Sequence, residues 1–246
     1  MLANLWETTK AIFFGLDWGF NPTHTQSAIR AAEIFLSGQK NHPGIDKIIN
    51  ESFNESNGFA WNEFQRDMDT PWDLQKFLID YPKDSVGYEY AIFMNKLGYG
   101  TLSMNLAASV SPKVRSIIGL GVRNHDLVHF LFDLYDTDKD GKLSINDYHE
   151  WVFLFYTLGV VGQESATLPK ILLIPSQIKA FVTFRYSEFQ KAKKIGNTLS
   201  SAQNLNLMWL KPYFHKSVEQ VRVELGIKTL DEVVHREINT FAKFPS

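Results

Sequence analysis

The longest apolar run in the chain, WVFLFYTLGVVG at residues 151–162, leaves almost no polar face for water. It is too short to cross a bilayer, because a membrane-spanning helix needs about 20 apolar residues. As a helix, residues 148–158 would be apolar nearly all round, and such a helix is stable only when other elements surround it. The run therefore predicts a buried core helix.

Start and stop signals of further helices recur along the chain. We find no strand pairs, hairpin signals, repeats or dividing linker in the sequence. The chain is therefore expected to form one all-α domain over residues 1–246. In the first half of the chain, the predicted helices are residues 23–37 before Gly38, a short helix within 41–59, residues 83–98 with a Ser or Asp N-cap and Gly98 as the stop, and one from Pro112 with Ser111 as N-cap. In the second half they are residues 175–196 ending at Gly196, residues 213–226 ending at Gly226, and one opened by a capping box of Thr229 and Glu232.

Composition excludes several classes of protein. The net charge is −2 and no window clusters Lys and Arg, so no nucleic-acid partner is expected. The chain has no cysteine, so a transition metal would have to be bound by histidines and carboxylates. Its first residues resemble neither a signal peptide nor a transit peptide, which favours a cytoplasmic location.

Aromatic residues are frequent, with 19 Phe, 9 Tyr and 6 Trp. They are explained either by a Phe-rich core or by a chain that lines a long apolar pocket or rests on a membrane. The sequence leaves these alternatives open.

Residues 136–147 read D-T-D-K-D-G-K-L-S-I-N-D, which is typical of an EF-hand calcium loop with Gly141 at its sharp turn. Apolar faces precede and follow the loop, as in a helix–loop–helix, although a solvated acidic turn would explain the same letters. Aspartate at the last ligand position favours magnesium over calcium, and a lone loop favours a structural role over a sensor. The predicted ligands are Asp136, Asp138, Asp140, the Lys142 carbonyl, Ser144 and Asp147.

Immediately before this loop, His125 and His129 are four residues apart and therefore share one helix face, as in H-E-x-x-H zinc sites. Asp126 could be a ligand, an orienting partner or a base. Glu150 lies in the apolar helix, where a buried carboxylate needs a partner or a metal. The alternative is an ordinary His pair on a helix. Zinc, manganese or iron suits such ligands better than copper(I).

His125-Asp126-x-x-His129 resembles the H-D-x-x-H motif of the coenzyme Q biosynthesis family called coenzyme Q protein four, in which Glu follows after eleven residues. The segment LIDYPKDSVGYEYAIFMNKLG at 78–98 and the segment LNLMWLKPYFHKSVEQVRVELGI at 205–227 are also similar to family segments, in the same order. The resemblance covers roughly residues 25–228.

The resemblance implies a helical fold with a bound divalent metal, a pocket for a polyprenyl tail, and peripheral contact with the inner face of a membrane. It also implies removal of the ring C1 carboxyl during ubiquinone synthesis, coupled to hydroxylation, and a scaffolding role for other pathway enzymes. The expected catalytic and metal-binding residues are His125, Asp126 and His129.

The chain departs from the family after the histidines. Gly141 stands where the family has its Glu, because about six extra residues form the acidic loop. Aligning the downstream segment places Asp147 at the family position, while Glu150 one turn later is the other candidate for the metal ligand. Both candidate sites thus lie within residues 124–158. The other functions considered are a calcium-binding protein and a lipid-binding scaffold without catalysis.

Overall fold

The computed structural model describes residues 9–14, 17, 25–38, 61–103, 112–134, 148–165, 174, 177–178, 180–199, 205, 208–230 and 232–233. Helices dominate these residues, so the all-α prediction is confirmed. None of the described helices is long and apolar enough to cross a membrane. The helices are α2 (Thr25–Gly38), α4 (Trp61–Asp69), α5 (Leu74–Asp80), α6 (Val86–Lys96), α7 (Pro112–Leu131), α8 (Tyr148–Ser165), α10 (Tyr186–Leu199) and α11 (Val218–Leu225), with a 3-10 turn at Lys211–Tyr213.

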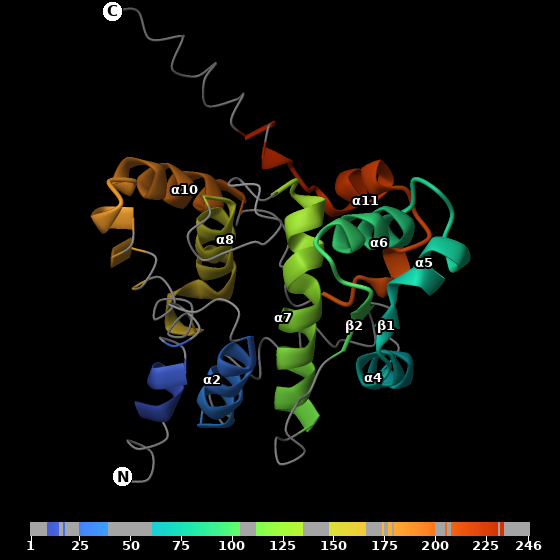
Figure 1. Ribbon diagram of the computed structural model, residues 1–246, viewed down its shortest axis with the longest axis horizontal. Coiled ribbons are helices and arrows are strands. Elements are labelled where there is room, and N and C mark those ends of the chain that lie inside the picture. The colour runs from blue at the N-terminus through green and yellow to red at the C-terminus, as the bar shows by residue number, and fades with distance from the viewer. Residues whose placement is uncertain are drawn as a thin grey trace, which may run out of the picture.

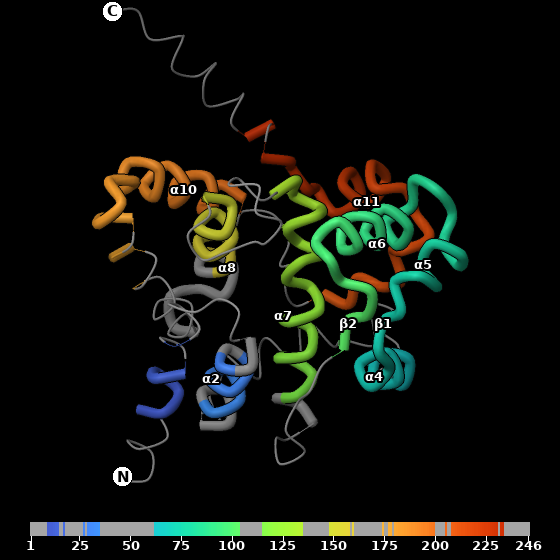
Figure 2. Tube along the Cα trace, viewed as in Figure 1, coloured from blue at the N-terminus to red at the C-terminus, as the bar shows by residue number. Residues whose placement is uncertain are grey.

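Helix α7 stands at the centre of the molecule (Figure 1). Helices α4, α5, α6 and α11 lie on one side of it, and α2, α8 and α10 lie on the other, an arrangement that Figure 2 traces along the Cα atoms. Helix α8 packs against α10, and α2, α4 and α6 each contact α7. The sequence did not predict the short antiparallel pair of β1 (Trp72–Asp73) and β2 (Thr101–Leu102), in which Trp72 faces Leu102.

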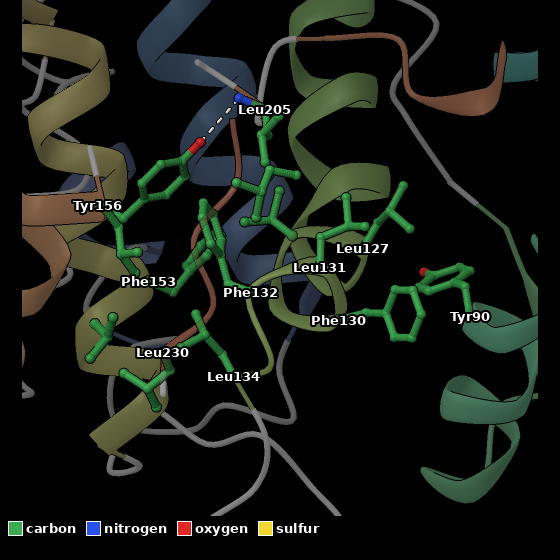
Figure 3. Close-up of a cluster of buried hydrophobic side chains, with 14 of the residues drawn as sticks. Tyr90, Leu127, Phe130, Leu131, Phe132, Leu134, Phe153, Tyr156, Leu205 and Leu230 are labelled. Carbon is green, nitrogen blue, oxygen red and sulfur yellow. Dashed lines mark hydrogen bonds between the residues drawn. The ribbon is translucent and has the colours of Figure 1, made fainter. Parts of the chain in front are cut away.

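The predicted core helix is buried as expected. Every side chain from Trp151 to Tyr156 is at most 7% exposed, so all faces of this part of α8 are covered. Figure 3 shows Phe153 and Tyr156 of α8 beside Phe132, which lies just past the end of α7. The rings of Phe132 and Tyr156 meet edge to face with centroids 5.0 Å apart. Burial of each such ring contributes about 1.5–3 kcal/mol to stability.

Several predicted helix ends are confirmed. The Ser85 hydroxyl accepts a hydrogen bond from the Tyr88 amide at the start of α6, and Gly98 after that helix has φ 87°. Helix α7 begins at Pro112. Gly226 ends α11 with φ 65°, a backbone conformation that glycine adopts without strain. Thr229 and Glu232 exchange the two hydrogen bonds of a capping box.

The predicted helix over residues 175–196 is wrong in two respects. A turn at Phe184, with φ 58°, separates α10 from the helical residues before it. Helix α10 also continues through Gly196, because this glycine serves packing rather than helix termination. A Cβ there would lie 2.5 Å from the Val152 carbonyl oxygen and 2.6 Å from the Phe155 Cβ. The missing side chain lets α10 approach α8 closely.

Leu205 links the two central helices. The buried Asn124 of α7 donates to the Leu205 carbonyl at 2.7 Å and to the Met208 carbonyl at 2.6 Å. The Leu205 amide donates to the Tyr156 hydroxyl of α8 at 3.0 Å, the bond drawn in Figure 3. Leu205 therefore connects α8 to α7 through Asn124, the residue that precedes His125 in the chain.

Arg123 anchors α7 to the residues of α4 and β1. Its guanidinium lies 4.3 Å from the centre of the Trp72 ring and donates to the carbonyls of Met68 and Thr70 at 3.2 and 2.7 Å. The buried Asp67 lies 3.8 Å from the same guanidinium and accepts a bond from the Trp72 indole at 2.9 Å. These contacts lock α7 to α4 and β1.

Candidate metal centre

Helices α7 and α8 bring three predicted site residues together. His125 and His129 project from α7, and Glu150 projects from the first turn of α8. Ligand atoms of the three side chains all lie within 4.8 Å of one another. The His129 Nε2 is 3.1 Å from one Glu150 carboxylate oxygen, and the His125 Nε2 is 3.5 Å from the other. The spacing of four residues on α7 produces this arrangement, since it places both rings on one helix face.

The backbone fixes the ring of His129. Its Nδ1 lies 3.3 Å from the Leu134 carbonyl oxygen, which can only accept, so Nδ1 carries the proton and donates. The Leu134 amide donates back to the His129 carbonyl at 2.8 Å. In the neutral ring, Nε2 therefore presents a lone pair to Glu150.

Arg222 of α11 holds the turn that carries Leu134. Its guanidinium donates to the Leu131 carbonyl at 3.0 Å and to the Asp133 carboxylate at 2.6 Å. Asp133 has φ 56°, a conformation that costs energy for any residue with a side chain. The ion pair stabilises this turn, which directs the next carbonyl, that of Leu134, at His129.

Asp126 fixes the ring of His125. Its carboxylate oxygen lies 2.9 Å from the His125 Nδ1 and accepts a hydrogen bond from that nitrogen. The His125 Nε2 is thereby directed at Glu150. Carboxylate–histidine pairs of this kind orient metal ligands and raise their basicity. Of the three roles open to Asp126 from the sequence, the geometry favours the orienting one, since the cluster of potential ligand atoms does not include it.

Four buried atoms at the centre have no hydrogen bond. They are the Nε2 atoms of His125 and His129 and both carboxylate oxygens of Glu150. Neutral histidines in these orientations would direct lone pairs at a carboxylate, which is unfavourable in a buried site. Either a proton or a metal cation between the atoms resolves the conflict.

Without a metal, a proton occupies this position. Burial by itself lowers the pKa of His125, but the charge of Glu150 and the bond to Asp126 outweigh it and raise the pKa to about 10. Burial alone would raise the pKa of Glu150, yet the charge of His125 and contacts with both histidines hold it well below its usual range. Glu150 is therefore ionised and able to bind a cation, which would displace the proton of His125.

The geometry fits a divalent metal. With metal–ligand bonds of about 2.1 Å, neighbouring ligand atoms of a tetrahedral site are about 3.4 Å apart. The His129 Nε2 is 3.1 Å from one Glu150 oxygen and the His125 Nε2 is 3.5 Å from the other, both close to this value, and the candidate ligand atoms all lie within 4.8 Å of one another. The ring of Phe153, one turn after Glu150, lies 4.6 Å from the His125 ring and 4.7 Å from the His129 ring, and shields the centre with apolar surface.

Three of the residues predicted from the sequence thus meet in one cluster, and a fourth orients it. Asp147 lies outside the described residues, so its competing assignment as a metal ligand stays a prediction, while Glu150 faces the histidines. The calcium or magnesium loop also stays a prediction. Its proposed ligands Asp136, Asp138, Asp140, Lys142 and Ser144 lie outside the residues that the structure describes.

Sequence reasoning missed the parts that position the ligands. The carbonyl of Leu134 and the guanidinium of Arg222 are invisible in a motif search, because a backbone acceptor has no sequence signature and Arg222 is far from the histidines in the chain. Arg222 lies in the RVELGI segment, which is similar to the family, but that similarity did not indicate a function for this arginine.

Removing the Asp126 carboxylate is expected to weaken metal binding without abolishing it. In Asp126→Ala the His125 ring loses its partner at Nδ1, and loss of such partners lowers metal affinity by about 10–100-fold. Asp126→Asn keeps an acceptor and should lose less. Competition with a chromophoric zinc chelator measures both affinities. Unchanged affinity in Asp126→Ala would show that His125 needs no orienting partner.

The fold and the centre define a class: a helical protein that can hold a metal ion with two histidines and one glutamate. A search of protein-family models finds no match. A search of curated proteins also finds none. A solved structure of a proposed ubiquinone biosynthesis protein from Nostoc punctiforme has a similar fold, with a TM-score of 0.58 and 14% sequence identity. The similarity covers 89% of this chain and 97% of that chain, and at this identity it shows the fold alone.

Proposed function

We propose that this protein is a metal-dependent enzyme of ubiquinone synthesis that removes the ring C1 carboxyl of a polyprenyl-tailed benzoate. The observation that carries the metal dependence is the meeting of four buried ligand atoms from His125, His129 and Glu150, none of which has a hydrogen-bond partner. The pathway is supported by the H-D-x-x-H resemblance and by the helical fold shared with the Nostoc protein.

The chain's own residues have distinct parts in this reaction. His125, His129 and Glu150 would hold zinc, manganese or iron, and Asp126 and the Leu134 carbonyl keep the two rings in position. The metal would supply Lewis acidity, which stabilises negative charge on the substrate as carbon dioxide leaves. The bond between the ring carbon and the carboxyl breaks, its electron pair stays on the ring, and a proton takes the vacant place.

The polyprenyl tail would supply much of the binding energy. Each buried methylene contributes about 0.8 kcal/mol, so an isoprenoid chain binds tightly to an apolar surface. The aromatic side chains on either side of α7 are packed in the core of the described residues, so the tail pocket is a proposal that rests on the family resemblance. In this proposal the protein also contacts the membrane in which the substrate lies and other enzymes of the pathway.

Release of labelled carbon dioxide tests the activity. Protein reconstituted with zinc, manganese or iron is incubated with a prenylated hydroxybenzoate that carries ¹³C in its carboxyl, and the gas is analysed by mass spectrometry. We expect release that depends on the metal and is lost in Glu150→Gln. The control Glu224→Gln makes the same chemical change in an exposed ion pair with Lys216 and should retain activity.

Two results would contradict the proposal. Absence of labelled carbon dioxide with every metal would remove the decarboxylase function, and binding of the same lipid without turnover would then favour a scaffold. Equal release by Glu150→Gln and the unchanged protein would place the reaction elsewhere in the molecule.

A further inference from the structure

A group of large apolar side chains is exposed at the beginning of α10. We define the aromatic tip as Phe181, Val182, Phe184 and Tyr186, whose side chains are 74%, 65%, 95% and 41% exposed. Ile174 and Ile178, earlier in the same region, are about half exposed. Single exposed apolar residues are common on protein surfaces, but a contiguous group marks a surface that binds something.

The backbone holds Phe184 in this exposed position at a cost. Its φ of 58° lies in the left-handed region, which costs a residue with a bulky side chain about 1–3 kcal/mol. Two hydrogen bonds fix the turn: the Phe184 amide donates to the Phe181 carbonyl at 3.2 Å, and the Arg185 amide donates to the Ala180 carbonyl at 2.8 Å. A fixed, strained turn that directs a phenyl ring into water indicates a ligand for that ring.

Basic residues accompany the aromatic tip. Residues 180–199 contain four basic residues and a single acidic one, Glu188, although the whole chain has a net charge of −2. Lys191, Lys193 and Lys194 are exposed on α10, whereas Phe189 and Ile195 on its opposite face are buried. Apolar rings flanked by lysines are typical of surfaces that enter the interface of an anionic bilayer.

The helix that follows the tip is closely packed. Helix α10 packs on α8 through Gly196, whose position leaves no space even for a methyl group. The tip therefore lies at the end of a firmly held helix, at the left of Figure 1, far from α5 and α11 on the other side of α7. Helix α8 also carries Glu150, so the pair of α8 and α10 connects the metal centre with this surface.

We propose that the aromatic tip docks this protein on an anionic lipid surface, with Phe181 and Phe184 in the acyl boundary and the α10 lysines at the headgroups. This docking surface rests on the proposed function for its purpose, but the residues that form it lie outside the metal centre. Membrane docking and decarboxylation can therefore fail separately.

Sedimentation with lipid vesicles tests the apolar contact. The full chain is mixed with vesicles of phosphatidylcholine alone or with added phosphatidylglycerol, and the bound fraction is measured. We expect binding to the anionic vesicles, and at least a tenfold loss in the double variant Phe181→Ser with Phe184→Ser. The control Ile79→Ser with Val223→Ser alters side chains of similar exposure, 81% and 74%, on α5 and α11, and should bind within about twofold of the unchanged protein.

A second variant tests the charge. Lys191→Glu with Lys193→Glu should lower binding to anionic vesicles by about tenfold or more and leave binding to neutral vesicles unchanged. Circular dichroism of every variant verifies that the helices form. The proposal is overturned if the unchanged protein ignores anionic vesicles or if the aromatic-tip variant still binds them. It is also overturned if the Ile79 and Val223 control loses as much binding, or if the lysine variant binds anionic vesicles normally.

Discussion

Replacing Glu150 with glutamine is expected to lower zinc affinity by more than about 100-fold, beyond the range produced by loss of an orienting partner. Glutamine keeps the size of the side chain but removes the negative charge of the carboxylate, whose two oxygens lie 3.1 Å from the His129 Nε2 and 3.5 Å from the His125 Nε2. Titration of the metal-free protein in excess calcium measures this affinity, because calcium would occupy an oxygen-only loop and leave zinc to the histidines.

The stability of the metal-free variants measures what the buried ion pair contributes to folding, apart from any bound metal. His129→Ala leaves the buried Glu150 carboxylate with less compensation, which should lower the free energy of unfolding by about 3–5 kcal/mol. Glu150→Gln removes the buried charge itself and should cost much less. If Glu150→Gln keeps its zinc affinity, the account of the centre is wrong, whatever its stability.

Gly196→Ala is expected to destabilise the protein by about 1–3 kcal/mol, as overpacking of a core does. The new methyl would meet the Val152 carbonyl at 2.5 Å and the Tyr156 amide nitrogen at 2.8 Å, and these backbone atoms cannot rotate away. Helices α8 and α10 would have to separate. Urea denaturation in the presence of a chelator measures the change without a contribution from bound metal.

Gly121→Ala is the matched control in α7. A Cβ at Gly121 meets nothing within 4 Å, so the same substitution should stabilise the helix by about 0.5–1 kcal/mol through its backbone propensity alone. Opposite signs at the two positions are therefore the expected result. Equal effects would mean that Gly196 does not set the distance between the helices.

Helix ends with a local signal could be predicted from the sequence. Ser85, Gly98, Gly226 and the pair Thr229–Glu232 act through residues at most four positions away, so their patterns are complete within the chain segment itself. The burial of α8 also followed from its own apolar residues. These features required no knowledge of the partner helices.

Other features depend on contacts between distant segments and could not be predicted. Gly196 matched the pattern of a helix stop, but its real constraint is the backbone of α8 more than 40 positions earlier. The exposure of Phe184 depends on a left-handed turn, and phenylalanine gives no signal for such a turn. Hydrophobic periodicity is a property of one segment. It therefore could not show that Gly196 packs against α8 or that the helix is interrupted at Phe184.

The candidate site, too, could be predicted only where a local pattern is sufficient. The spacing of His125 and His129 is sufficient to predict that both rings share one helix face, because residues four apart on a helix lie one above the other. The choice between Asp147 and Glu150 could not be made, because it depends on how α8 packs beside α7. The carbonyl of Leu134 is fixed by the salt bridge of Arg222 to Asp133, which joins segments about 90 residues apart, and no local pattern reveals it.

X-ray absorption of the cobalt- or zinc-loaded protein tests the central claim most directly, since it reports which atoms surround the metal. We expect two imidazole nitrogens at about 2.0–2.1 Å with oxygen completing the shell, and loss of that imidazole signal in the double variant His125→Ala with His129→Ala. A shell made only of oxygen would contradict the account and would place the metal in the acidic loop at residues 136–147.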